Sequence, residues 1–256
     1  MKPKRILLLG GTADARRLAD ALHQSGIHVI YSLAGLVRIP QVDCELLVGG
    51  FTQFGGLVNY LQSQAQQGQT IDAIVDVTHP YAQTMSSKAV LAAQQAGIPC
   101  WRFHRPAWQQ ETGDNWHFYQ NQEELLSALA KFQRPLLSAG QMTKEWLQTI
   151  AAQPQIDSII WRTAVPAKFS LPEKVVWLKA IGPFAYEDEQ ALIKQHKIDV
   201  IVSKNSGGQA TYAKLVAARK LNLPVYLQAR PELPPADREF DDLAVCLQAC
   251  QQAWAN

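Results

Sequence analysis

The chain has 256 residues, of which 47% are hydrophobic and 18% are charged. This is the composition of an ordinary globular protein with a sizeable core, arranged as one large or two modest domains. The formal charge of +2 gives no reason to expect nucleic acid binding, and no apolar run approaches the length needed to span a membrane.

The cysteines and the start of the chain indicate a reducing, cytoplasmic setting. Cys44, Cys100, Cys246 and Cys250 form no Cys-x-x-Cys pair, and the last two have the i,i+4 spacing of one helix face. We expect them to be small buried groups rather than metal ligands or a disulfide. The basic residues at the start precede an apolar run that is too short for a secretory signal.

The first predicted strand, Ile6 to Leu9, ends in a glycine-rich turn that leads into residues with helical spacing. Glycines let the backbone approach a ligand closely, and a helix N-terminus offers N–H groups to an anion such as a dinucleotide pyrophosphate. Because Thr12 departs from the dinucleotide fingerprint, a tight turn of any α/β protein is the alternative. The turn consists of Gly10, Gly11, Thr12, Ala13, Asp14 and Ala15.

The second predicted strand, His28 to Ser32, ends without the acid that holds the ribose hydroxyls in NAD-binding units. Ser32 stands there instead, and Arg38 follows it by a few residues. This favours a phosphorylated ribose, and therefore NADP, although both residues could simply belong to the loop.

Another strand, expected over 71–77, delivers Thr78, His79, Pro80 and Tyr81 to the carboxyl edge of the sheet. We expect Pro80 in the first turn of the helix that follows. Ligands of open α/β sheets gather at this edge, so a binding role is favoured. For His79, a satisfied place beside a helix cap is the alternative.

Strand and helix signals alternate to Phe103, as in a parallel sheet covered by helices. The polar segment from Gln109 to Asn115 is the expected linker, with domains over 1–113 and 114–256. In the second half we expect strands over 116–119, 135–140, 158–162, 174–178, 198–203 and 225–227, helices over about 122–131 and 210–220, and a closing amphipathic helix that carries Leu243 and Trp254.

Three markers of the first half recur in the second, at offsets of 127, 125 and 125 positions. A near-constant offset predicts two similar α/β halves with a cleft between them, and chance matches of common strand residues are the alternative. The pairs are Ile71-Asp72-x-Ile74-Val75 with Ile198-Asp199-x-Ile201-Val202, Pro99 with Pro224, and Arg105-Pro106 with Arg230-Pro231.

The second half has its own glycine turn, which consists of Lys204, Asn205, Ser206, Gly207 and Gly208. The lysine supplies charge, the polar side chains supply donors, and the glycines let backbone N–H groups point at an anion. The spacing is not that of a Walker A loop. A structural turn with a solvated lysine is the alternative.

No Ser-His-Asp order, His-Glu-x-x-His motif or metal-ligand spacing is found, and we expect no metal. Hydride transfer needs none of these, because the cofactor carries the reactive centre. Cations near predicted strand ends could meet a substrate with many carboxylates, although each alone is expected to be a solvated surface residue. They are Arg102, Arg105, Arg162, Lys179, Lys204 and Arg230.

Taken together, these segments resemble the precorrin-6A reductases of cobalamin biosynthesis, from about residue 5 to 231. The combination of Thr78-His79-Pro80 with Lys204-Asn205-Ser206-Gly207-Gly208 is the most specific part. The other matching segments are Leu9 to Arg16, Val48 to Phe51, Asp76 to Ala82, Arg105 to Trp108, Gly182 to Phe184 and Tyr212 to Leu215.

The resemblance implies two Rossmann-like domains with a nicotinamide cofactor in the cleft. The missing acid after the second strand favours NADPH over NADH. The resemblance also implies hydride delivery to a tetrapyrrole, a corrin precursor whose C18–C19 double bond is reduced while a neighbouring carbon gains a proton. Cofactor contacts are expected from Gly10 to Ala15, Ser32, Arg38, Thr78 and Lys204 to Gly208, and substrate contacts from His79, Pro80, Tyr81, Arg105 and Lys204. The proton donor is unknown; His79, Lys204 and water are the candidates.

The family commonly has arginine where Leu36 and Gln141 stand, and either could have met a cofactor phosphate or a substrate carboxylate. The sequence does not separate metal-free from cobalt-bearing substrates, and it leaves the oligomeric state open. Two alternatives stand beside the reductase: a two-domain sugar-nucleotide transferase, and a non-catalytic two-lobed protein that binds an anion. The lack of a secretory signal counts against the second.

Overall fold

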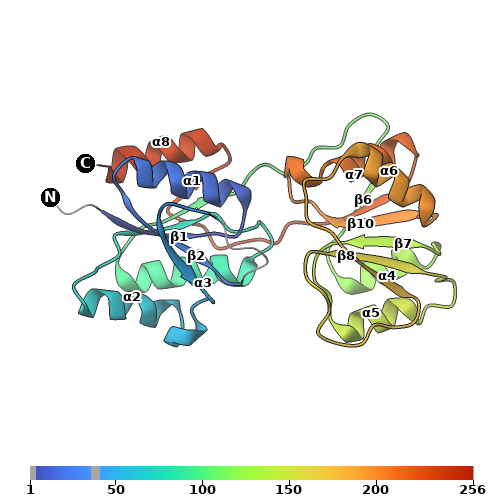
Figure 1. Cartoon of the computed structure of the whole chain (residues 1–256), viewed down its shortest axis with the longest axis horizontal. Coiled ribbons are helices and arrows are strands. Elements are labelled where there is room, and N and C mark those ends of the chain that lie inside the picture. Colours follow the sequence, from blue (N-terminus) through green and yellow to red (C-terminus); the bar gives the residue numbers. More distant parts are fainter. Residues whose placement is uncertain (1–3, 36–40, 256) are drawn as a thin grey trace. The chain divides into compact units, whose positions relative to one another are not determined.

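The computed structural model describes residues 4–35 and 41–255. Within them, two six-stranded parallel sheets form two compact units (Figure 1). One unit comprises Met1–Pro106 with Pro231–Asn256, and the other comprises Ala107–Arg230. The expected α/β class with two Rossmann-like parallel sheets is confirmed.

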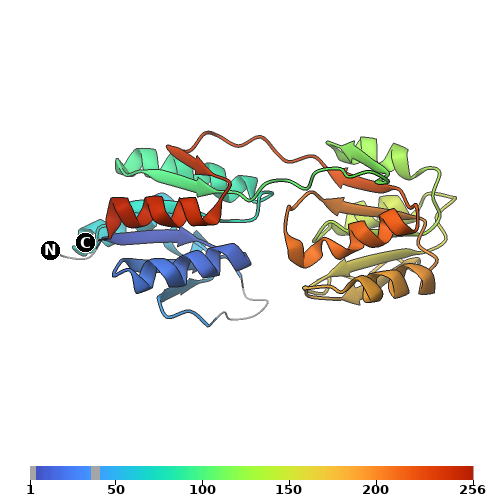
Figure 2. The same ribbon diagram turned by 90° about the horizontal axis from the view of Figure 1, so that it is seen from above.

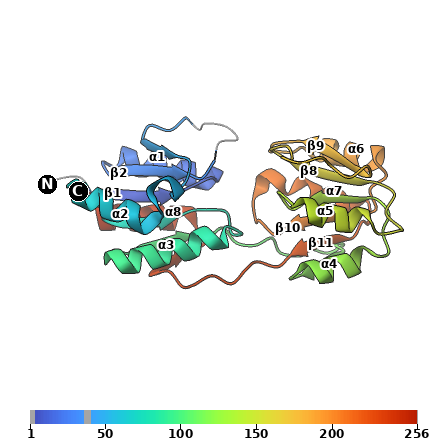
Figure 3. The same cartoon turned by 90° about the horizontal axis from the view of Figure 1, so that it is seen from below.

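The first unit is built from elements at both ends of the chain. They are β1 (Arg5–Leu9), α1 (Ala13–Gln24), β2 (His28–Leu33), β3 (Glu45–Val48), the 3-10 turn η1 (Thr52–Phe54), α2 (Leu57–Gln66), β4 (Ala73–Asp76), α3 (Gln83–Ala96), β5 (Cys100–Phe103), β12 (Arg238–Phe240) and α8 (Leu243–Trp254). The strand order is β12-β5-β4-β1-β2-β3, so the direction of winding reverses between β4 and β1. Helices α1 and α8 cover one face, and α2 and α3 cover the other (Figures 1 and 3).

The second unit has the equivalent order β6-β11-β10-β7-β8-β9, which reverses between β10 and β7. Its elements are β6 (Trp116–Tyr119), α4 (Gln122–Leu129), β7 (Pro135–Ser138), α5 (Lys144–Ala151), β8 (Ile159–Thr163), β9 (Val175–Lys179), α6 (Tyr186–Gln195), β10 (Val200–Lys204), the 3-10 turn η2 (Gln209–Thr211), α7 (Ala213–Lys220) and β11 (Val225–Gln228). Helices α4 and α5 cover one face, and α6 and α7 the other (Figure 1).

The last segment of the chain belongs to the first unit, which differs from the predicted domain over 114–256. Strand β12 pairs with β5, and α8 lies beside α1 (Figures 1 and 2). The rings of Trp254 and Trp101 stand 4.2 Å apart, and Gln251 donates to the Ser25 hydroxyl at 2.7 Å. The sequence does not assign this last segment to the first unit. An amphipathic pattern does not indicate which sheet a helix covers, and β12, with only three residues, is too short to give a strand signal.

The expected linker, Gln109 to Asn115, is an ordered loop of the second unit. Arg219 on α7 binds Glu111 and Asp114, each through a contact of 2.8 Å. The chain instead passes between the units at Pro106 and again at Pro231. The two Arg-Pro pairs of the internal repeat therefore mark the two passages.

Two local expectations also needed correction. Helix α5 was not predicted, although Thr143 is its N-cap and accepts the Trp146 N–H at 3.2 Å. Pro80 is not in the first turn of α3. That helix begins at Gln83, because the Ala82 N–H is drawn into a turn with the His79 carbonyl at 2.7 Å.

The internal repeat corresponds to equivalent hydrogen bonds at the amino ends of the two sheets. The Asp72 carboxylate accepts the Arg5 N–H at 2.8 Å, which ties the start of β4 to the start of β1. The Asp199 carboxylate accepts the N–H groups of Gln133 and Arg134 at 2.7 and 3.0 Å, before β10 and β7. These charge-assisted bonds set the register of the two central strands in each sheet.

Asp199→Ala should therefore lower the free energy of unfolding by about 2 kcal/mol, because two backbone donors lose a charged acceptor. Asp157→Ala is the matched control. Its carboxylate makes an exposed pair with Arg134, which is worth less than about 1 kcal/mol. Urea unfolding followed by tryptophan fluorescence measures both, and equal losses would contradict the anchoring role of Asp199.

Candidate functional site

A crevice of about 200 Å³ opens at the carboxyl edge of the first sheet, where the strand order reverses. This is the position at which open α/β sheets bind ligands. Five of the residues predicted from the sequence line it: Gly10, Gly11, Ser32, Thr78 and His79. The others that line it are Leu9, Ala34, Gly50, Phe51, Ala82 and Met85.

The glycine turn of this crevice lies directly against Tyr31. A β-carbon on Gly10 would stand 2.2 Å from a ring carbon of Tyr31, so no side chain fits there. The Gly11 N–H donates to the Tyr31 hydroxyl at 3.3 Å, and Gly11 itself has a φ of +110°. Burial raises the pKa of Tyr31, which keeps its hydroxyl protonated. Tyr31 was not predicted, because its contact with the turn crosses from β2 to β1.

The other predicted residues of this turn mostly build the start of α1. The Thr12 hydroxyl accepts the Ala15 N–H and donates to the Val77 carbonyl, both at 3.0 Å. Ala15 is buried in the core. Ala13 is exposed in the first turn, where helix N–H groups favour an anion.

Asp14 links two cations to the start of α1. Its buried carboxylate pairs with Arg17 one turn along, and the Nε of Arg105 stands 3.3 Å from Oδ2. Arg105, predicted as a substrate contact, is thus held at the glycine turn. The carboxylate serves to position these guanidinium groups.

Thr78 is positioned by a buried ion pair that the sequence analysis missed. Its hydroxyl and N–H donate to Asp76 Oδ1 at 2.7 and 3.1 Å, and the Nε of Arg102 stands 3.3 Å from Oδ2 of the same carboxylate. Arg102 is 2% exposed, so the expectation of a solvated cation was wrong. The available signal was the position of Arg102 inside an otherwise apolar strand, Cys100–Phe103, which indicates a buried arginine.

His79 and Tyr81 form a small polar turn beside the crevice. The Tyr81 N–H donates to Nδ1 of His79 at 3.3 Å, so the neutral ring carries its proton on Nε2. Their rings are 5.6 Å apart, and Pro80 between them is buried. Arg38 and Leu36 lie outside the described residues.

Lys204 lines a separate crevice of about 300 Å³ in the second unit. A β-carbon on Gly140 would stand 3.7 Å from the Nζ of Lys204. Burial lowers the pKa of Lys204. Gln141 also lines this crevice and donates to the Val165 carbonyl at 2.8 Å.

The rest of the predicted Lys204–Gly208 turn has structural partners in the second unit. The Asn205 side chain accepts the Trp108 N–H at 2.7 Å and donates to the Trp108 carbonyl at 3.2 Å. The Ser206 N–H donates to the Lys204 carbonyl at 2.9 Å. Gly207 has a φ of +71°, and Gly208 leads into η2. Only Lys204 of these five lines the crevice.

In the second unit a buried ion pair occupies the place that Ser32 holds in the first. In the register of β7 and β8, Leu137 pairs with Trp161, so the next residues, Ser138 and Arg162, lie side by side. Leu9 and Ser32 form the equivalent pair between β1 and β2 of the first unit. The Nη1 of Arg162 donates to both carboxylate oxygens of Glu189 at 2.9 Å, and the guanidinium lies 4.4 Å from the centre of the Phe184 ring. Arg162 was also expected in solvent, and this too was wrong.

Lys214 lies near this pair and is 2% exposed. Its ammonium donates to the Thr211 carbonyl at 2.9 Å and lies 4.9 Å from the centre of the Trp108 ring. Burial, reinforced by the nearby charge of Arg162 and opposed by Glu189, lowers the pKa of Lys214 to about 7.

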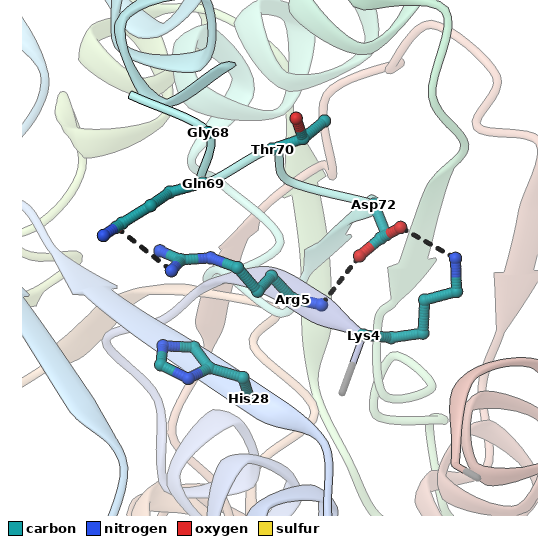
Figure 4. Close-up of a pocket in the computed structure, with 7 residues that line it drawn as sticks. All are labelled: Lys4, Arg5, His28, Gly68, Gln69, Thr70 and Asp72. Carbon is teal, nitrogen blue, oxygen red and sulfur yellow. Dashed lines mark hydrogen bonds and ion pairs between the residues drawn. The ribbon is translucent and has the colours of Figure 1, made fainter. Parts of the chain in front are cut away.

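A hollow of about 470 Å³, larger than the crevice at the glycine turn, lies at the opposite, amino end of the first sheet (Figure 4). Its polar groups bind one another: Lys4 pairs with Asp72 at 2.9 Å, and Arg5 donates to Gln69 at 3.1 Å. His28 approaches Glu45 at 2.7 Å. We regard this hollow as structural, because it lies away from the edge where the candidate ligand groups converge.

Two further properties concern the described residues only. Among them, no group of three or more His, Cys, Asp or Glu side chains is arranged to hold a metal ion. None of the helices found there has the length and apolar character that crossing a membrane requires.

Comparison with known proteins identifies relatives over nearly the whole chain. The protein-family profile described as "Precorrin-6x reductase CbiJ/CobK" matches residues 5–251. The chain is similar to the precorrin-6A reductase of Rhodococcus erythropolis, with 40% identity over 94% of each chain. It is also similar to the precorrin-6A reductase of Rhodobacter capsulatus, with 35% identity over 91% of this chain and 90% of the relative.

Two other matches bear on the substrate and the fold. The cobalt-precorrin-6A reductase of Priestia megaterium is 29% identical over 89% of this chain and 91% of its own. A solved structure of CobK precorrin-6A reductase matches with a TM-score of 0.84 and 32% identity, over 97% of this chain and 96% of that one.

The buried lysine predicts a pH dependence of stability. Because the pKa of Lys214 is about 7 when folded and about 10.4 when unfolded, the unfolded chain binds more protons between these values. The free energy of unfolding should thus rise with pH, by about 1 to 2 kcal/mol from pH 7 to 8.5. Lys214→Met should remove this rise, and parallel urea midpoints for wild type and variant would contradict the assignment.

Proposed function

The chain belongs to the precorrin-6x reductase family, and we propose that it reduces the C18–C19 double bond of precorrin-6A with hydride from NADPH. One observation carries the proposal: the family-matched glycine turn, Ser32 and Thr78 converge on one crevice at the switch point of the first sheet. The higher identity to precorrin-6A reductases than to the cobalt-precorrin enzyme favours the metal-free substrate.

The crevice of the first unit fits part of a nicotinamide dinucleotide. The absent side chain at Gly10 leaves room over Tyr31 for close approach, and the first turn of α1 offers N–H groups to a pyrophosphate. Phe51, 7% exposed, adds an apolar wall. Gly10 to Ala13, Ser32 and Thr78 would hold the cofactor, which supplies hydride when bound.

The residues of the chain then bind and orient the reactants. Asp76, fixed by Arg102, holds Thr78 at the crevice. Arg105, held by Asp14, offers a cation to a phosphate or to a carboxylate of the macrocycle. His79, whose Nδ1 accepts the Tyr81 N–H, presents an Nε2 proton that makes it the favoured proton donor to the neighbouring carbon.

NADPH is favoured over NADH because no acid stands at the end of β2. Ser32 occupies that end and lines the crevice, so no carboxylate at this position repels a 2′-phosphate. We further place the reaction in the cytoplasm, where the four buried cysteines would remain as free thiols.

Turnover tests the proposed function directly. With purified metal-free precorrin-6A, the protein should consume NADPH absorbance faster than NADH absorbance, and more slowly with the cobalt-loaded precursor. Binding of a sugar nucleotide without any nicotinamide oxidation would instead support a transferase. Binding of the precursor without oxidation of either cofactor would support a non-catalytic protein.

Ser32→Asp should raise the Kd of NADPH at least tenfold while changing that of NADH much less, because the new carboxylate would face the 2′-phosphate. Ser32→Asn is the control of similar size without charge. Nicotinamide fluorescence titrations measure the six dissociation constants, one for each cofactor with the wild type and with each of the two variants. Equal weakening of both cofactors by Ser32→Asp would show that Ser32 does not lie at the ribose.

A further inference from the structure

Asn205 directly follows Lys204, the last residue of β10, and both ends of its side-chain amide are bonded. The Oδ1 accepts the Trp108 N–H at 2.7 Å, and the Nδ2 donates to the Trp108 carbonyl at 3.2 Å. We call this pair of bonds the Asn205 clamp. Because Asn205 is only 5% exposed, its amide has little surface left to offer to a ligand.

The backbone that the Asn205 clamp holds is itself fixed in the second unit. The Trp108 side chain is buried in the same core cluster as Ile201 of β10. The Asn205 carbonyl in turn accepts the Nε of Arg230 at 3.0 Å. The end of β10 is therefore tied to both boundaries of the unit, which runs from Ala107 to Arg230.

Strand alternation connects the Asn205 clamp to the direction of Lys204. Along β10, Val200 and Val202 pack beneath α4 and α5, whereas Ile201 packs on the face of α6 and α7. The clamp holds Asn205 on the face of Ile201. Lys204 must then point to the other face, where it lines the crevice at the starts of α4 and α5. The clamp thus sets which side of the sheet receives the ammonium.

The chain after Asn205 gives this direction little support of its own. Gly207, with a φ of +71°, and Gly208 follow closely, and glycine lowers the cost of other backbone conformations. A one-residue slip of the strand end would turn Lys204 toward the opposite face, which the ion pair of Arg162 and Glu189 already fills. The Asn205 clamp opposes this exchange of faces.

We propose that Asn205 is a positioning residue for the reduction: by holding the end of β10 to the Trp108 backbone, it directs the Lys204 ammonium into the crevice of the second unit. The inference rests on the proposed function and on the family resemblance, which implies that Lys204 contacts the substrate. It also changes the expected role of Asn205, from a contact with the cofactor to a residue that acts through its neighbour.

The test compares Asn205→Ala with Asp199→Ala. The two side chains hold opposite ends of β10 in similar ways, since Asp199 accepts two backbone N–H groups at 2.7 and 3.0 Å at the amino edge of the sheet. Both variants should unfold at a lower temperature than the wild type, as followed by tryptophan fluorescence. Only Asn205→Ala should raise the Kd of precorrin-6A in absorbance titrations, by about fivefold, while the Kd of NADPH from fluorescence changes by less than about twofold.

A double-mutant cycle separates positioning from a general loss of structure. Lys204→Met alone should raise the Kd of precorrin-6A. Adding Asn205→Ala to Lys204→Met should raise it by less than about twofold more, because the side chain that Asn205 directs is already gone. The loss of thermal stability caused by Asn205→Ala should be the same in both backgrounds. If Asn205→Ala is unfolded, Asn205→Ser takes its place, since a serine hydroxyl is too short to reach both Trp108 backbone groups.

Each contrary outcome has a distinct meaning. In a wild-type protein that oxidises NADPH normally, equal precorrin-6A affinity in Asn205→Ala and Asp199→Ala would overturn the inference alone. So would full additivity in the cycle, or wild-type affinity for precorrin-6A in Lys204→Met. Weakened binding of NADPH alone in Asn205→Ala would overturn it by making Asn205 a cofactor contact. Failure of the wild type to oxidise any nicotinamide would contradict the proposed function, and the inference would fall with it.

Discussion

The contact between Gly10 and Tyr31 constrains everything at the edge of the first sheet. The phenol ring occupies the space that a side chain at position 10 would need, and its hydroxyl holds the Gly11 N–H. The backbone must therefore turn tightly at this point. That turn places Thr12 where it caps α1 and bonds to the end of β4, so two strands and one helix are joined beside the crevice.

The two units show how one topology can acquire two chemistries. Their strand orders correspond one to one, and Asp72 and Asp199 make the same kind of anchor at the amino ends. The carboxyl ends have diverged. Ser32 leaves the first crevice open, whereas Arg162 and Glu189 fill its counterpart with a buried ion pair. Anchors that preserve register are thus shared, and residues that face ligands are not.

Much of this arrangement could be predicted from the sequence because its signals are local. Apolar runs that end in glycine located β1 and its turn, and the recurrence of Asp72 as Asp199 indicated two similar halves. Five residues of the first crevice were predicted because each lies within three residues of the carboxyl end of a strand.

What the sequence did not reveal depends on contacts between distant segments. Tyr31 meets Gly10 across two strands, and Asp76 meets Arg102 across two others. Neither pair has a characteristic spacing. For the same reason, Asn205 could not be recognised as the residue that fastens the Trp108 backbone, and a short strand such as β12 carried no pattern that named its partner.

The passage of the chain out of the first unit and back has a consequence for its biosynthesis. The second unit is continuous from Ala107 to Arg230 and contains all six of its own strands. In the first unit, β5 lacks its outer partner, β12 (Arg238–Phe240), until that strand has emerged from the ribosome. During translation, the outer edge of β5 is therefore exposed while the whole second unit is being made, and nascent chains arrested in that interval would carry an open, aggregation-prone strand.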